Sequence, residues 1–254
     1  MAIVDRYAGV VFDIDGVLMR GESALPGAAD ALDALAARGL PTVFVTNNAR
    51  RTPAEIAGWL ASAGLDVDPD RIVTSALAAA ALLAPGTRCL VLGMAGLREA
   101  LDARRCRIDD DPETAEAVVV GFDRSLCLDD LRRATEAIVR GARFVGTHGD
   151  TSLPVEGGIW PGNGAILAAL EAATGVAPEI AGKPRPPLFE AAAGRLGVTP
   201  LLVVGDRLET DIVGAAAVGW DSALVLSGVD DRATAAAADP GPTYVVDGVA
   251  DLLA

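Results

Sequence analysis

The chain has 254 residues, of which 51% are hydrophobic and 22% charged, and its 35 acidic residues outnumber the 21 basic ones to give a net charge of −14. This apolar content is enough for a sizeable core, and it excludes general disorder. The acidic balance argues against a nucleic-acid partner, because phosphate backbones are bound by surplus Lys and Arg. An anionic small substrate stays open, because a bound cation can reverse the local charge.

The sequence carries no sign of a membrane or secreted protein. The longest stretch without a charged residue, Ile72–Thr87, is interrupted by Pro and Gly and is too short to span a bilayer. Charged residues interrupt the N-terminus, so no secretory signal is visible. Cys89, Cys106 and Cys127 have neither metal-binding nor redox spacing. We therefore expect reduced cysteines, with Cys89 in the core, in a cytoplasmic protein.

Short β-branched runs alternate along the chain with Ala- and Leu-rich helical patterns, which is typical of a parallel sheet covered by helices. In chain order, strands are predicted at Gly9–Phe12, Thr42–Val45, Arg88–Leu92, Ala117–Val120, Arg143–Val145, Leu201–Val204 and Ala223–Leu226. Between them, helices are predicted at Ala28–Ala37, Thr52–Ala63, Leu97–Ala103, Asp129–Arg140, Ala165–Ala173, Pro187–Leu196 and Asp211–Val218. These βα units exceed what one sheet of ordinary width needs, so the middle of the chain is predicted to be an inserted domain.

Four polar clusters follow predicted strands or lie in the loops after them, at the sheet edge where open α/β proteins bind ligands. Asp13-Ile14-Asp15 offers two carboxylates for a divalent cation and a reacting group, and its strand-like flanks exclude an EF-hand. Thr46-Asn47-Asn48 offers a hydroxyl and amides that can hold a phosphoryl oxygen. Taken alone, each of these two clusters is also compatible with an ordinary turn.

The other two clusters lie in the last third of the chain. Gly182-Lys183-Pro184 presents a cation in a loop, although an isolated lysine there is usually a solvated surface residue. Asp206, Glu209 and Asp211 follow the strand that ends at Val204. These acids suit a hard metal ion, with a helix N-cap as the alternative.

In this order the four clusters resemble the motifs of the haloacid dehalogenase superfamily. The segments Gly121–Asp123, Gly146–Asp150 and Pro161–Ala165 resemble the cap of its subfamily IIA, which includes 4-nitrophenyl, glycerol-phosphate, phosphoglycolate and pyridoxal phosphatases and the phosphatase of the N-acetylglucosamine operon. The resemblance covers essentially the whole chain. It implies an α/β fold with a Rossmann-like parallel-sheet core, formed by residues 1–81 and 179–254, and an α/β cap domain inserted at residues 82–178.

The resemblance further implies a Mg²⁺-dependent phosphatase that hydrolyses a small phosphomonoester, such as a sugar, glycerol or other metabolite phosphate, through an aspartyl-phosphate. Asp13 would be the nucleophile, and Asp15 would be first the general acid and then the general base. Thr46 and Asn47 would hold the phosphoryl oxygens. Lys183 would bind the phosphate and neutralise both the nucleophile and the transferring group.

The same resemblance implies a metal site. Mg²⁺ would be bound by Asp13, by Asp206 and by the backbone carbonyl of Asp15, which leaves positions for waters and a phosphate oxygen. Asp211 would orient the waters on the metal. Glu209 is the weaker candidate of its loop and serves equally well as an acid at a helix start.

The implied cap would close over the site, exclude water and select the leaving group. The chain has His148-Gly149-Asp150 where the family commonly has Asn-Pro-Asp, which makes His148 and Asp150 candidate substrate contacts, with a surface loop as the alternative. Arg51 matches the family and is also a candidate. Arg50 replaces a small hydroxyl residue, and it either meets an anionic substrate or is a solvated charge.

Two other functions are compatible with this fold, namely a phosphomutase and a catalytically silent ligand-binding protein. The presence of every motif residue disfavours the silent protein. Asp15 favours phosphatases over the dehalogenases and phosphate pumps of the superfamily, which lack an Asp there. We therefore expect a small phosphorylated metabolite as the partner, no nucleic acid or membrane, and pairing of two copies through the cap.

Overall fold

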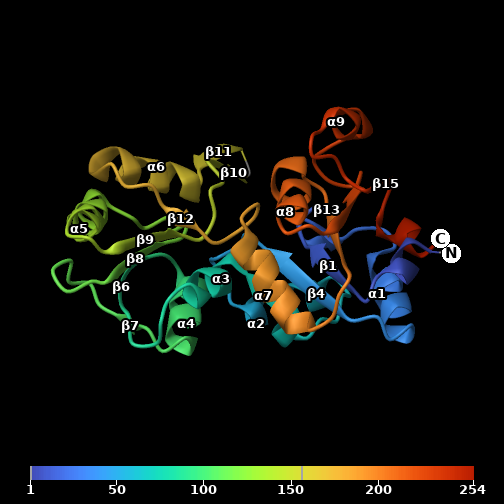
Figure 1. The fold of residues 1–254 in the computed structure, drawn as a ribbon, viewed down its shortest axis with the longest axis horizontal. Coiled ribbons are helices and arrows are strands. Elements are labelled where there is room, and N and C mark those ends of the chain that lie inside the picture. Colours follow the sequence, from blue (N-terminus) through green and yellow to red (C-terminus); the bar gives the residue numbers. More distant parts are fainter. Residues whose placement is uncertain (1, 156) are drawn as a thin grey trace. The chain divides into compact units, whose positions relative to one another are not determined.

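Two α/β units make up residues 2–155 and 157–254, the part of the chain that this computed structural model describes (Figure 1). The first unit comprises Met1–Thr46, Pro53–Val73 and Lys183–Ala254. The second comprises Asn47–Thr52 and Thr74–Gly182. Along the chain the second unit is therefore an insertion into the first, and each unit has a parallel sheet of its own.

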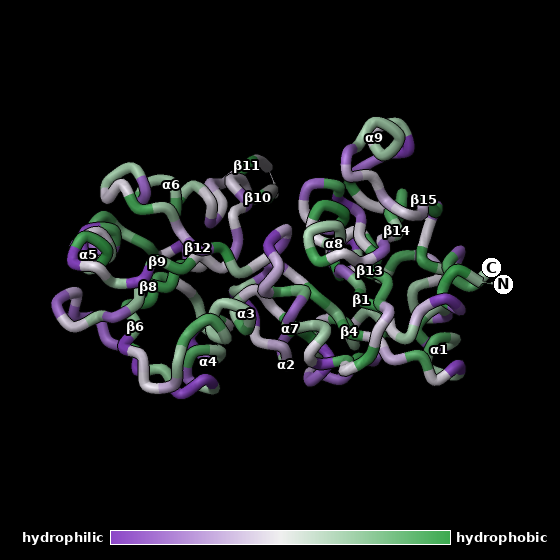
Figure 2. Tube along the Cα trace, in the orientation of Figure 1, coloured by the Kyte–Doolittle hydropathy of each residue, from purple (hydrophilic) through white to green (hydrophobic). Residues whose placement is uncertain are grey.

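The sheet of the first unit has the strand order β15–β14–β13–β1–β4–β5, and its pairings from β15 to β4 are parallel. These strands are β1 (Gly9–Asp13), β4 (Thr42–Thr46), β5 (Ile72–Thr74), β13 (Leu201–Gly205), β14 (Asp221–Val225) and β15 (Tyr244–Val246). Strands β1, β4 and β13 are buried along their whole length, as parallel strands covered on both faces should be. Figure 2 shows them mostly in hydrophobic colours.

Helices and short turns surround this sheet. The helices of the first unit are α1 (Ala28–Ala37), α2 (Pro53–Ser62), α7 (Pro186–Leu196), α8 (Val213–Ala217) and α9 (Arg232–Ala237). A π-helical turn, Leu208–Ile212, leads into α8, and a two-stranded hairpin, β2 (Met19–Arg20) and β3 (Ser23–Ala24), follows β1. Helix α7 packs against β4 and α8. In the core the rings of Phe12 and Phe44 stack with centroids 6.1 Å apart.

The register of the central strands determines which residues meet at the carboxyl edge of the sheet. Asp13 of β1 lies beside Val45 of β4, and Phe12 lies beside Val204 of β13. The chain continues from β1 to β4 on one side and returns in β13 on the other, so β1 is the point where the strand order reverses. Ligands of open α/β sheets bind at such a point, outside the carboxyl ends of the strands.

The second unit is built on a parallel sheet in the order β12–β9–β8–β6–β7. Its strands are β6 (Arg88–Leu92), β7 (Arg107–Ile108), β8 (Ala117–Val120), β9 (Arg143–Gly146) and β12 (Glu179–Ile180). An antiparallel hairpin, β10 (Ser152–Val155) and β11 (Gly158–Pro161), stands outside this sheet. Its helices are α3 (Ser75–Ala81), α4 (Ala95–Ala103), α5 (Leu128–Val139) and α6 (Asn163–Thr174).

A separate hydrophobic core holds the second unit together. Helices α5 and α6 pack on one face of its sheet, where Leu90, Val118 and Phe144 meet Ile138 and Leu167. Helices α3 and α4 pack against each other and lie on the other side of the sheet in Figure 1. The insertion therefore buries an apolar interior of its own.

The α/β fold predicted from the sequence is confirmed, and several elements coincide with their predicted ranges, among them α1 and β6. The sequence pattern did not reveal β5, α3 or the short strand β15. The predicted helix over Asp211–Val218 differs at its start, because a π-helical turn precedes α8. Cys89 is buried in β6, as expected, and all three cysteines are free.

Among residues 2–155 and 157–254, helices long and apolar enough to cross a membrane are absent.

A substitution in the second core should cost stability in proportion to the cavity it leaves. We expect Leu90→Ala, at a side chain that is 1% exposed, to lower the free energy of unfolding by about 2–5 kcal/mol. Leu128→Ala makes the same chemical change at a side chain that is 81% exposed, and it should cost less than about 0.5 kcal/mol. Urea denaturation followed by circular dichroism measures both, and equal losses would contradict the assignment of this core.

Candidate active site

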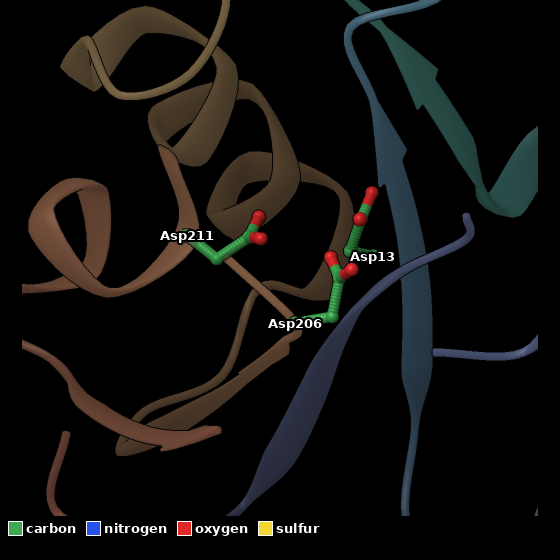
Figure 3. Close-up of side chains that lie close together, drawn as sticks. All are labelled: Asp13, Asp206 and Asp211. Atoms are coloured by element: carbon green, nitrogen blue, oxygen red, sulfur yellow. The ribbon is translucent and has the colours of Figure 1, made fainter. Parts of the chain in front are cut away.

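Three carboxylates meet at the carboxyl edge of the first unit's sheet. Asp13 is the last residue of β1, Asp206 directly follows β13, and Asp211 lies in the π-helical turn. One oxygen from each lies within 4.8 Å of the others, and Figure 3 shows the carboxylate of Asp211 turned toward the other two. The three residues are 6%, 2% and 0% exposed, respectively, so this is a buried cluster of like charges.

Lys183 joins two of these carboxylates. Its Nζ lies 2.7 Å from Oδ1 of Asp13 and 2.6 Å from Oδ1 of Asp211, and the residue is only 4% exposed. The other oxygen of Asp211 accepts hydrogen bonds from the backbone N–H of Arg207 at 3.2 Å and from the hydroxyl of Thr210 at 3.3 Å. The contacts of Asp211 thus hold the lysine ammonium against Asp13.

The electrostatics of the cluster show a deficit of positive charge. Burial raises the pKa of Asp13 well above its usual range, and Asp211 and Asp206 add to this rise, which the nearby Lys183 does not offset. Burial, together with repulsion from Asp211, raises the pKa of Asp206 to about 6. Burial alone would lower the pKa of Lys183, but Asp13 and Asp211 outweigh it and raise that pKa, so the lysine stays charged.

The cluster fits a divalent cation. Three carboxylates face one ammonium, so two negative charges are uncompensated when all are ionised. Oδ1 of Asp206 is buried and has no hydrogen-bond partner among the described residues, whereas its Oδ2 accepts the backbone N–H of Val229 at 2.9 Å. Because Mg²⁺ prefers carboxylate oxygens, Asp13 and Asp206 are the side chains that can hold it, while Asp211 is bound to Lys183.

Two glycines fix the position of Asp206. A Cβ on Gly16, whose φ is +82°, would lie 2.2 Å from Oδ2 of Asp206, and a Cβ on Gly228 would lie 2.0 Å from the same atom. Their loops are joined, because the hydroxyl of Ser227 donates a hydrogen bond to the carbonyl of Gly16 at 2.8 Å. The backbone N–H of Asp230 donates to the carbonyl of Asp206 at 3.1 Å. The carboxylate therefore sits in a cradle with no space for larger residues.

The first unit also holds Thr46, Asp15 and Glu209 of the predicted motifs. Thr46 is buried at the end of β4, beside the strand that ends in Asp13. Asp15 is exposed, and its backbone bridges to Met19 in the turn after β1. Glu209 is exposed in the π-helical turn and is absent from the carboxylate cluster found among the described residues.

A second polar cluster lies within the second unit. Nδ1 of His148 is 3.0 Å from Oδ2 of Asp150, and the same oxygen is 3.5 Å from Nδ2 of Asn47. Asn47 is also held through its backbone carbonyl, which accepts a hydrogen bond from the hydroxyl of Ser75 at 2.7 Å. The structure thus brings Asn47, from the motif Thr46-Asn47-Asn48, next to His148 and Asp150. Arg51 is partly buried a few residues further along the same loop.

The sequence placed Asn163 in a segment that resembles the family's cap, but it gave this residue no role. Asn163 is fully buried, and its Nδ2 contacts the carbonyls of His148 and Val120 at 2.7 and 3.3 Å and the hydroxyl of Thr147 at 3.3 Å. It therefore fixes the loop that carries His148. The cradle at Ser227 and Gly228 was missed, although it closely follows the strand predicted at Ala223–Leu226.

Comparisons with known proteins find related sequences. Residues 10–106 match the profile of the haloacid dehalogenase-like hydrolases, and residues 180–252 match a second profile described as HAD-hydrolase-like. The chain is 36% identical over 244 residues to an acid sugar phosphatase of Staphylococcus haemolyticus, covering 94% of this chain and 92% of that protein. It is 40% identical over 254 residues to a D-glycerol 3-phosphate phosphatase of Mycobacterium tuberculosis, covering 96% and 70%.

Solved structures show the same similarity. The crystal structure of a glycerol phosphate phosphatase from Mycobacterium tuberculosis in complex with magnesium superimposes with a TM-score of 0.94 at 38% sequence identity. The match covers 100% of this chain and 78% of that one. The same enzyme has also been crystallised in complex with calcium. A relative with this fold therefore binds the class of cation that the carboxylate cluster fits.

We predict that Gly228→Ala weakens Mg²⁺ binding about 10–100-fold, because the added methyl group must displace the carboxylate of Asp206. The measurement is the rise in thermal unfolding midpoint as Mg²⁺ is titrated into the metal-free protein. Gly194→Ala is the matched control, because a Cβ at that position in α7 meets no atom within 4 Å. Wild-type Mg²⁺ affinity in the Gly228 variant would disprove the cradle.

Proposed function

The chain belongs to the haloacid dehalogenase-like hydrolase family, and from this premise we propose that it is a Mg²⁺-dependent phosphatase that transfers the phosphoryl group of a small phosphomonoester to Asp13 and then to water. The observation that carries this proposal is the buried pair of Asp13 and Lys183 beside Asp206. Phosphoryl transfer depends on positioning and on neutralising charge, and this arrangement serves both needs.

Asp13 is the nucleophile in this proposal. Its carboxylate attacks phosphorus while the bond to the ester oxygen breaks, and Asp15 donates a proton to the departing oxygen. Asp15 then takes a proton from water, which attacks the aspartyl-phosphate and releases inorganic phosphate and free Asp13. The contrasting environments of the two carboxylates support these roles, because Asp13 is buried against Lys183 whereas Asp15 is exposed and can exchange protons with solvent.

In this proposal Lys183, Thr46 and Asn47 bind the oxygens of the transferring phosphoryl group. The Lys183 ammonium offsets the charge of Asp13 so that an anionic phosphate can approach it. Mg²⁺, held by Asp13, Asp206 and the backbone carbonyl of Asp15, supplies further charge neutralisation when bound. Asp211 keeps the lysine in place through their contact of 2.6 Å. It would also orient waters on a bound metal ion.

The substrate in this proposal is a small phosphorylated metabolite, a sugar or glycerol phosphate or a similar ester. Two relatives named as an acid sugar phosphatase and a D-glycerol 3-phosphate phosphatase support this class. Residues 82–178 would act as the cap that selects the leaving group. The polar loop of His148 and Asp150, fixed by Asn163, supports that role, and Arg51 is a further candidate contact.

We also propose that the protein is cytoplasmic and pairs through its cap. The free thiols of Cys89 and Cys106, both buried, support a reducing compartment. The exposed apolar side chains of Ile159 and Trp160 on hairpin β10–β11 support an association surface in the cap.

Asp13→Asn tests the mechanism, because it keeps the size of the side chain and removes the attacking charge. We expect phosphate release from 4-nitrophenyl phosphate to fall to background. The thermal midpoint of the metal-free variant should equal or exceed that of the wild type, because one of three repelling buried carboxylates is gone. A variant that retains a tenth of wild-type activity would rule out the aspartyl-phosphate.

His148→Ala and Asp150→Ala test the selection of the leaving group. Neither residue belongs to the carboxylate and lysine cluster, so we expect each to raise KM for the preferred metabolite about two- to tenfold, the effect of one hydrogen bond. Hydrolysis of the activated ester 4-nitrophenyl phosphate should change less. Steady-state kinetics on both substrates decides, and equal small effects would show that the loop is only a surface feature.

A further inference from the structure

We propose that Arg20 and Ser227 are positioning residues that hold Asp206 in place for Mg²⁺, and that the clasp they form sets the preference of this protein for Mg²⁺ over Ca²⁺. The clasp consists of two hydrogen bonds, from the guanidinium of Arg20 to the carbonyl of Ser227 and from the hydroxyl of Ser227 to the carbonyl of Gly16. This inference rests on the proposed function and deepens its metal site. All of its residues belong to the first unit.

Two loops from the neighbouring strands enclose Asp206. The sheet order places β13, which Asp206 follows, between β14 and β1. The loop after β14 carries Gly228 and the loop after β1 carries Gly16, and a Cβ on these glycines would lie 2.0 and 2.2 Å, respectively, from Oδ2 of Asp206. The backbone N–H of Val229 donates to the same oxygen at 2.9 Å. The position of the carboxylate therefore depends on the positions of both loops.

The clasp joins these two loops across Asp206. Ser227 precedes Gly228 in the loop after β14, and its hydroxyl donates to the carbonyl of Gly16 at 2.8 Å. The carbonyl of Ser227 in turn accepts a hydrogen bond from the guanidinium of Arg20, on hairpin β2–β3. Ser227 thus uses both its side chain and its backbone to tie its own loop to the segment that follows β1.

The backbone of Arg20 is fixed although its side chain is exposed. The preceding residue, Met19, is fully buried, and its carbonyl accepts a hydrogen bond from the backbone N–H of Gly16 at 2.7 Å. The two strands of the hairpin pair with each other as well. Because the hairpin and Gly16 belong to one hydrogen-bonded turn, the contact of Arg20 with Ser227 also restrains the glycine that packs on Asp206.

A fixed Asp206 matters more for Mg²⁺ than for Ca²⁺. Mg²⁺ needs oxygens at about 2.0–2.1 Å in nearly ideal octahedral geometry, whereas Ca²⁺ accepts about six to eight oxygens at about 2.3–2.6 Å in flexible arrangements. Oδ1 of Asp206 is buried and has no hydrogen-bond partner among the described residues, so it is the oxygen that the clasp would present to the ion. If this carboxylate could shift, the affinity for the smaller ion would fall first.

The charge of Arg20 by itself predicts the opposite effect. A guanidinium near the site repels any bound cation, so if repulsion were its only influence, removing it would strengthen the binding of both ions. If Arg20 only stabilised the fold, its loss would lower the thermal midpoint of the metal-free protein and leave both affinities unchanged. The clasp predicts a third result, in which Mg²⁺ binds more weakly and Ca²⁺ binding is nearly unchanged.

The test measures the affinities of the metal-free protein for Mg²⁺ and Ca²⁺, from the rise in thermal unfolding midpoint with cation concentration. We expect Arg20→Met and Ser227→Ala each to weaken Mg²⁺ binding about three- to tenfold, within the range for one hydrogen bond, and Ca²⁺ binding less than about twofold. The double variant should lose little more than either single one, because both bonds belong to one clasp. Arg20→Lys, which keeps a donor for the carbonyl of Ser227, should restore part of the affinity.

Arg195→Met is the matched control. Arg195 is also exposed, and its guanidinium also donates to a backbone carbonyl distant along the chain, that of Asp70, so its loss should leave both affinities unchanged. Asp206→Asn gives the response to cations that bind elsewhere on this acidic chain. Unchanged or tighter Mg²⁺ binding in either Arg20→Met or Ser227→Ala, or equal losses for both cations, would overturn the clasp. A wild type whose midpoint responds to neither cation would instead refute the proposed metal site.

Discussion

The buried ion pair of Lys183 with Asp13 and Asp211 is the interaction on which the site of this protein depends. An ammonium at 4% exposure is costly to bury unless its charge is matched, and two carboxylates at 2.7 and 2.6 Å match it. The same contacts place the ammonium beside the carboxylate that we propose as the nucleophile. Without the ammonium of Lys183, three buried carboxylates would face one another unmatched, so the pairing restrains the loop before α7 and the π-helical turn together.

Even with this pairing, the carboxylates of the site carry more negative charge than Lys183 neutralises. Asp206 adds a third carboxylate whose Oδ1 has no hydrogen-bond partner among the described residues, and burial raises the pKa of this group to about 6. Such an arrangement is unfavourable for the protein alone and favourable once a divalent cation and a phosphate share it. The glycine cradle at Gly16 and Gly228 fixes the carboxylate of Asp206, so it cannot move away from the other two carboxylates. The repulsion between the carboxylates lowers the stability of the folded protein, but it accompanies the preorganised site that phosphoryl transfer requires.

The second unit contributes a loop whose backbone is fixed by hydrogen bonds. Ser75 and Gly96 hold this loop, residues 47–52, through hydrogen bonds. In the loop, the side chain of Asn47 lies next to Asp150, and the guanidinium of Arg50 lies over the ring of Phe122. Asn47, which we propose as a phosphate ligand, and Arg50 therefore share one backbone segment, so the position of one cannot change without the other. This coupling provides a physical reason why substitutions in such a loop would alter the choice of substrate while the chemistry of the core unit persists.

The sequence by itself determined the α/β class and most strands and helices, because these follow from local patterns of hydrophobicity. It marked Asp13 and Asp206 as polar residues that follow predicted strands, whereas Lys183 became a candidate only through the order of the four motifs. Short elements such as β5 and β15 escaped it, since a few residues carry too little periodicity. Only the tertiary structure decided that Asp211 binds Lys183, that Gly228 cradles Asp206 and that Arg50 stacks on Phe122. Each of these contacts joins segments far apart in the chain, and their proximity depends on sheet register and loop packing, which no local pattern encodes.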